Sequence, residues 1–198
     1  YIAVAGKAAG TGIPFPGGPV PSGLVLRTAG AFVVVLDDAL RGVRFGARLS
    51  TLNAEATSVE MVDDLLYVTG VNDGALVLKN SYATTGSAFF TVLNSRATGT
   101  NALVYSTAFG TNATPQNLVV QRGLHTQDPL VVILGDGTGA VLPVPTRALS
   151  TTPNDLWLVT FDPAQRGGTS LYASTYLPGS AVETLSGGTT LSMVALPS

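Results

Sequence analysis

The strongest constraint on the fold is a set of four short segments that recurs three times, in the same order, along the 198 residues. Segments of the first kind are apolar runs closed by a glycine: YIAVAG at 1–6, LLYVTG at 65–70 and LVVILG at 130–135. Segments of the second kind end in polar turn residues: AFVVVLDD at 31–38, AFFTVLNS at 88–95 and LWLVTFDP at 156–163. An even repeat of this length indicates one supersecondary unit used three times.

The third and fourth kinds complete each unit. The third comprises VRFGARLS at 43–50, LVYSTAFG at 103–110 and LYASTYLPG at 171–179. The fourth comprises TSVEMVD at 57–63, QNLVVQR at 116–122 and TLSMVAL at 190–196. Each segment is about six or seven residues long, rich in β-branched or aromatic residues and bounded by turn formers, which is typical of strands. Helical periodicity is not sustained anywhere.

The sequence therefore predicts an all-β chain, residues 1–198 forming a single repeat domain with units at about 1–64, 65–129 and 130–198. Each unit should contribute four antiparallel strands, twelve in all. The second and third segments are joined by short turn-like links, so we expect them to pair as hairpins. The first and second are joined by longer links rich in Pro and Gly, and loops of this kind commonly carry binding residues.

Composition excludes several classes of function. Only 11% of the residues are charged, the formal net charge is -2, and there are 10 basic residues, so we expect no nucleic-acid partner. The absence of cysteine excludes disulfides and thiolate chemistry. No apolar run approaches the length of a membrane span. The chain opens at Tyr1 without a secretion leader, and we expect any leader to have been removed already.

These segments resemble the bacterial repeats that form β-propellers. The resemblance rests on AFVVVLDD, LVYSTAFG and the LYVTG strand, is closest over 31–110 and weaker over 124–198. The third unit departs from it with LVVILG, and the first with RFGARL in place of a Ser-Thr pair. The resemblance implies four-stranded blades arranged radially.

Three blades are too few for a closed ring, because closed propellers have about 4 to 8. The resemblance thus implies self-association or another chain that completes the ring, with exposed strand edges near 1–6 and 190–196. Three units of four strands also fit a threefold β-prism or a β-trefoil, which close within one chain. These alternatives remain open at the level of the sequence.

No set of residues indicates a catalytic site. His125, the only histidine, lies three residues before Asp128, but no serine can be chosen to complete a triad. The neighbouring carboxylates Asp37 and Asp38 fall where a turn is expected, as does the pair at 63 and 64, and Asp favours turns. Sequence neighbours on a strand point to opposite faces, so neither pair makes a two-carboxylate site.

Two glycine-rich stretches are candidate ligand loops. GDGTGA at 135–140 makes Asp136 a weak candidate calcium ligand, but it lacks the EF-hand spacing and is also a hairpin-turn signal, so we assign no metal or cofactor. GKAAGTG at 6–12 has its lysine before the glycines and no following helix, which excludes a phosphate loop.

The aromatic residues divide into core and surface candidates. Trp157 aligns with Phe32 and Phe89 and is expected to be a repeated core residue rather than a sugar platform. The exposed aromatic residues should come from four tyrosines: Tyr1, Tyr82, Tyr105 and Tyr172.

The sequence thus predicts a non-enzymatic, extracellular or cell-surface module of bacterial type that binds protein or glycan, or self-assembles through loops and strand edges. A polysaccharide hydrolase or lyase domain is the first alternative, and a capsid or appendage subunit is the second. The ligand, the full number of blades and the oligomeric state do not follow from the sequence.

Overall fold

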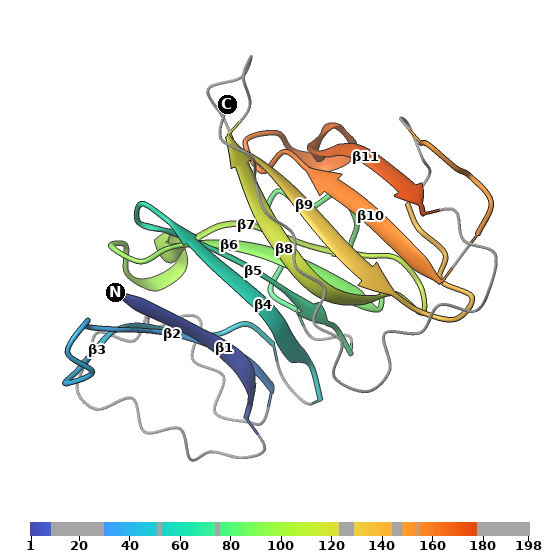
Figure 1. Cartoon of the computed structure of the whole chain (residues 1–198). Helices are drawn as coiled ribbons and strands as arrows, with labels where there is room; N and C mark the ends of the chain where they lie inside the picture. The colour runs from blue at the N-terminus through green and yellow to red at the C-terminus, as the bar shows by residue number, and fades with distance from the viewer. Residues whose placement is uncertain are drawn as a thin grey trace.

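The computed structural model is built almost entirely of antiparallel strands (Figure 1). It describes residues 1–8, 30–50, 53–73, 76–122, 129–143, 148–153 and 155–177. Within these ranges the chain forms eleven strands and two short 3-10 turns, η1 (Gly99–Ala102) and η2 (Gly167–Ser170). The prediction of an all-β chain is confirmed.

The strands form three sheets in chain order. The N-terminal sheet has the order β1-β2-β3: β1 (Ile2–Ala8), β2 (Gly30–Leu36) and β3 (Val43–Arg48). The middle sheet has the order β4-β5-β6-β7: β4 (Glu55–Val62), β5 (Leu65–Val71), β6 (Ala88–Asn94) and β7 (Leu103–Phe109). The C-terminal sheet has the order β11-β10-β9-β8: β8 (Thr114–Arg122), β9 (Pro129–Asp136), β10 (Leu156–Phe161) and β11 (Leu171–Tyr176).

Eleven of the twelve predicted strands are therefore present, and the twelfth, at 190–196, lies outside the described residues. The second and third segments of each unit pair as antiparallel hairpins, as predicted. The sheets are offset from the sequence units by one strand, because β4 pairs with β5 and β8 with β9. The described strands form three sheets and no closed barrel, so the propeller-type arrangement stays a prediction.

In the middle and C-terminal sheets, the glycine that closes the first segment allows a close approach of backbones. Gly70 faces Ala56 and Gly135 faces Pro115, and in both sheets the partner strand has a bulge at the next residue. A Cβ on Gly70 would lie 1.9 Å from the carbonyl oxygen of Glu55. Only glycine fits where the bulged strand crosses so closely.

In the second and third units, the threonine of the Ser-Thr pair in the third segment attaches the long link to its sheet. Thr107 Oγ1 accepts a hydrogen bond from the Ala83 amide at 3.0 Å and faces the carbonyl oxygen of the same residue at 3.2 Å. Thr175 Oγ1 does the same with Ser150, at 3.0 and 3.2 Å. A buried loop backbone needs such partners, which explains why the same short stretch recurs in two units.

The core lies in the two spaces between sheets. One cluster joins the N-terminal and middle sheets, and it includes Val33, Phe45, Leu66 and Phe89. The other joins the middle and C-terminal sheets around Trp157 and Phe161 in β10 and their aromatic neighbours. The middle sheet is thus buried on both faces, and its strands read as continuous apolar runs for that reason.

Candidate interaction surface

The outer face of the N-terminal sheet, which we call the N-terminal end face, exposes residues that are buried elsewhere in the repeat. Ile2 is 42% exposed and Val4 is 39% exposed. Residues in the same register positions of the other two sheets are fully buried: Leu66, Val68, Val131 and Ile133. Singly exposed aliphatic residues are ordinary, but here the same position is buried in both other sheets.

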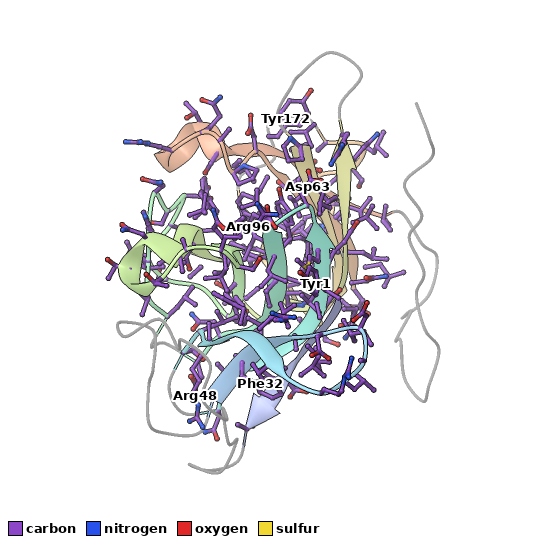
Figure 2. All side chains as sticks on the ribbon, turned by 90° about the vertical axis from the view of Figure 1, so that its left-hand side faces the viewer. Tyr1, Phe32, Arg48, Asp63, Arg96 and Tyr172 are labelled. Carbon is purple, nitrogen blue, oxygen red and sulfur yellow. The ribbon has the colours of Figure 1, made fainter. Side chains whose placement is uncertain are left out.

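Strand β2 extends this surface. Phe32 and Leu36 are only partly buried. Their register equivalents have no exposed surface: Phe89, Leu93, Trp157 and Phe161. The N-terminal end face is therefore apolar across two strands. The equivalent faces of the middle and C-terminal sheets each pack against the preceding sheet. Figure 2 shows the side of the molecule that carries Tyr1 and Phe32.

The C-terminal sheet presents the complementary end. Val132, Leu156 and Leu158 on its outer face are partly buried. Their equivalents in the middle sheet are buried against the neighbouring sheet: Tyr67, Ala88 and Phe90. We call this surface the C-terminal end face. The two end faces correspond to the two halves of an interface that occurs at each internal sheet junction.

A cleft of about 200 Å³ lies beside the start of β1. Its lining residues combine apolar, polar and charged groups: Tyr1, Val35, Arg44, Phe45, Met61, Asp64, Ser95 and Arg96. Arg96 Nε forms an ion pair with Asp64 Oδ1 at 2.8 Å, and the Ser95 amide donates to the Asp64 carbonyl oxygen at 2.8 Å. The cleft is smaller than the roughly 300–1,000 Å³ of typical ligand pockets.

The carboxylate pairs lie in turns, as expected. Asp37 Oδ1 accepts a hydrogen bond from the Arg41 amide at 2.7 Å. Asp63 has a φ of 54° in the turn between β4 and β5, and it forms an exposed ion pair with Arg122 at 2.7 Å. These carboxylates serve turns and surface ion pairs, and they do not converge on one point.

The candidate cation ligand Asp136 accepts a hydrogen bond from Gln116 Nε2 at 2.9 Å at the end of β9. Across the described ranges, no three residues of the His, Cys, Asp and Glu types gather as metal ligands. His125 and Asp128 lie outside the described residues. The stretch at 6–12 is described only through Ala8, which ends β1.

The aromatic predictions were partly right. Trp157 is fully buried, and its ring meets Phe109 edge-on at 6.0 Å, so the core interpretation is confirmed. Tyr1 and Tyr172 are exposed, at 73% and 40%. The prediction was wrong for Tyr105, which is fully buried because it faces the C-terminal sheet across the core.

Tyr82 was also expected among the exposed tyrosines, but it is partly buried and packs against the core. Its ring meets Phe161 edge-on at 6.3 Å. The link between β5 and β6 that carries Tyr82 is fastened to β7, and this attachment brings the ring to the core.

Tyr105 of the middle sheet forms a buried side-chain hydrogen bond with Ser170 of η2, which precedes β11 of the C-terminal sheet. Its hydroxyl lies 2.8 Å from Ser170 Oγ, which in turn donates to the Gly167 carbonyl oxygen at 2.7 Å. Burial raises the pKa of Tyr105 above its ordinary value, although the hydrogen bond to Ser170 acts the other way. The phenol is therefore a neutral structural group at ordinary pH.

The sequence identified β1 as a strand but missed the end face. The available signal was the repeat alignment, which places Ile2 and Val4 in the same columns as the buried residues of β5 and β9. The exposure of Ile2 and Val4 was not evident because the sequence of a strand does not show whether another sheet covers each of its faces.

Comparisons with models of protein families, with curated proteins and with solved structures found no match. Within the described ranges, no helix has the length and apolar character needed to cross a membrane.

Proposed function

We propose that this chain is a non-enzymatic assembly module that associates through its two end faces. The observation that carries the proposal is the exposure of Ile2 and Val4 at positions that are fully buried in the other two sheets. The same apolar face is buried against a neighbouring sheet in two sheets and is partly exposed in the N-terminal sheet. Such an exposed apolar face favours packing against another sheet.

Burial of the Ile2 and Val4 side chains should make the free energy of association more favourable. Fully burying an Ile or Val side chain contributes roughly 1.5–3 kcal/mol. With about two-fifths of each side chain still exposed, Ile2 and Val4 would each contribute about 1 kcal/mol on association. Phe32 and Leu36, which are partly buried, add to this surface.

The two end faces differ from each other, so association between copies is head-to-tail. Contacts of this kind produce rings if the rotation closes and filaments if it does not. Partly open faces at both ends of the described sheets favour a propeller-type series over a β-prism or β-trefoil, which would bury both faces within one chain. The low charge of the chain supports an extracellular or cell-surface location.

The test is the molar mass of the 198-residue chain by light scattering across a range of concentrations. The wild-type protein should exceed its monomer mass of 20.2 kDa as concentration rises. Val4→Asp should remain a monomer. Val77→Asp is the matched control, because Val77 is 37% exposed but lies in the link between β5 and β6.

A wild-type chain that stays monomeric at every concentration would overturn the proposal. So would a Val4→Asp variant that associates as strongly as Val77→Asp. Circular dichroism of both variants establishes that each retains the β fold.

A further inference from the structure

The cleft beside the start of β1 lies where the N-terminal and middle sheets meet, a junction that we call the first seam. Tyr1, Val35 and Arg44 line it from the N-terminal sheet. Asp64 and Arg96 line it from two turns of the middle sheet. Arg96 lies on the same side of the molecule as Tyr1 (Figure 2). A molecule bound in the cleft would therefore contact both sheets.

The junction of the middle and C-terminal sheets, the second seam, provides an internal comparison. By register, Leu65 stands there in place of Tyr1, and Val104 stands in place of Arg44. Both Leu65 and Val104 pack against the hydrophobic core. The first seam thus has a phenol ring and a guanidinium group at positions where the second seam has aliphatic side chains that extend the core.

A β-bulge sets the position of Arg44. The pairs between β2 and β3 on either side skip Arg44, which is the extra residue of the bulge. Val104 is the extra residue of β7 in the same way. Bulges often re-aim a side chain beside a functional site, and here the exposed Arg44 side chain lines the cleft. The bulge belongs to the repeat, whereas the arginine is particular to the first seam.

Arg96 adds a second guanidinium group on the opposite wall. Its turn is repeated in the C-terminal sheet, where Ala164 holds the same place and makes the same backbone hydrogen bond to an acidic or amide side chain two residues earlier. Arg96 binds Asp64 through Nε at 2.8 Å, which engages one of the five N–H donors of a guanidinium group. The second seam again has an aliphatic residue where the first has an arginine.

The charge of the cleft favours an anion. Its lining residues include two arginines, Arg44 and Arg96, and one carboxylate, Asp64, so their formal charge is two minus one, or +1. Arg44 forms no ion pair with any of the described residues. Guanidinium groups bind carboxylates through paired N–H donors, and such charge-assisted bonds are stronger than neutral ones.

The size and walls of the cleft limit the rest of the ligand. An apolar cavity of about 150 Å³ in a protein binds benzene, so a cleft of about 200 Å³ has room for one ring. Phe45 and Met61 supply an apolar wall, and Tyr1, which is 73% exposed, supplies a second ring face. A ligand that fills the cleft therefore combines one ring with one acidic group.

We infer that the cleft binds a single six-membered ring that carries a carboxylate. Arg44 and Arg96 bind the carboxylate, and the ring lies against Tyr1 and the apolar wall. Two sources share this chemistry: an aromatic acid and the uronic acid residue of an acidic glycan. The site is independent of the proposed association, because none of the cleft residues used here belongs to either end face.

Titration of the full chain with benzoate and with glucuronate, followed by two-dimensional amide NMR spectra, tests the inference. At least one of the two acids should shift the resonances of the cleft residues with a Kd on the order of 1 mM or tighter. Benzoate binding identifies an aromatic acid as the ligand class, and glucuronate binding identifies an acidic glycan. Absence of saturable shifts with both acids would overturn the inference.

The neutral analogues benzamide and glucose test the role of the carboxylate, and acetate tests the role of the ring. Each should bind about tenfold or more weakly than the acid that binds. A neutral analogue or acetate that binds as tightly as the acid would overturn the assigned chemistry.

Variants that copy the second seam test the arginines. Arg44→Val and Arg96→Ala should each weaken binding of the acid by about tenfold or more. Arg166→Val is the matched control, because Arg166 is an exposed arginine that precedes η2 in the C-terminal sheet. Circular dichroism establishes that each variant folds. Folded Arg44→Val that binds the acid as tightly as Arg166→Val would overturn the assignment of the site.

Discussion

Replacing Gly70 by alanine should destabilise the chain by a predictable amount. The added Cβ would lie 1.9 Å from Glu55 O and 2.8 Å from Ala56 Cα, and both contacts are backbone. A backbone neighbour in a paired strand cannot rotate away as a side chain can, so β4 must shift. Overpacking of this type costs typically about 1–3 kcal/mol, and a backbone clash belongs at the upper end.

The expected effect is therefore a loss of about 3 kcal/mol in the free energy of unfolding. For a chain of this length, 1 kcal/mol changes Tm by about 2–4 °C, so Tm should fall by roughly 6–12 °C. Equilibrium urea unfolding followed by circular dichroism measures the free energy, at protein concentrations low enough that association does not contribute.

Gly168→Ala is the matched control. An added Cβ at Gly168 meets nothing within 4 Å, so removal of glycine flexibility should leave stability unchanged or raise it by about 0.4–1 kcal/mol. If Gly70→Ala unfolds at the same urea concentration as Gly168→Ala, the steric explanation of the repeated glycine is wrong.

Three further predictions concern the hydrogen bonds and ion pairs of the sheets. Thr175→Val removes the hydroxyl that serves Ser150 and should cost about 1–3 kcal/mol in urea unfolding, whereas Thr169→Val, which removes an exposed bond, should cost less than about 1 kcal/mol. Because the pKa of Tyr105 is raised in the folded chain, the neutral phenol stabilises the fold below pH 10, and this stability is lost as pH rises through the folded pKa. Unfolding above pH 10 should thus depend less on pH in Tyr105→Phe, and an identical slope would contradict the assignment. Asp64→Asn breaks a surface ion pair, so it should change the unfolding free energy by less than about 1 kcal/mol; a larger loss would show a buried role.

The strands were predictable because each segment carries its own alternation and turn signals. The alignment of Phe32, Phe89 and Trp157 was correct, since each of them faces the glycine that closes the first segment of its unit. These are local properties, and a repeat presents them three times.

The offset between sheets and sequence units was not predictable from the segments alone. Residues 63 and 64 read equally well as the end of a unit and as a hairpin turn, and the structure shows the turn. Burial of Tyr105 was missed because its position in the repeat is occupied by Phe45 and Ala173 in the other sheets, so the alignment gives no consistent residue type.

The open end face is the feature that sequence reasoning about single strands does not reach. Ile2 and Val4 belong to an ordinary apolar strand, and only their comparison with the equivalent positions in a structure shows that a neighbouring sheet is missing. Solvent exposure depends on what lies beyond the strand, and that information is not local.

Solvent accessibility of the Ile2 and Val4 methyl groups at increasing protein concentration tests the assembly surface most directly. These residues are 42% and 39% exposed, so a soluble paramagnetic probe should broaden their methyl resonances in dilute solution. When copies associate, the broadening should fall at Ile2 and Val4 and persist at Val77, which is 37% exposed in the link between β5 and β6. Broadening at Ile2 and Val4 that is independent of concentration would contradict assembly through this end of the molecule.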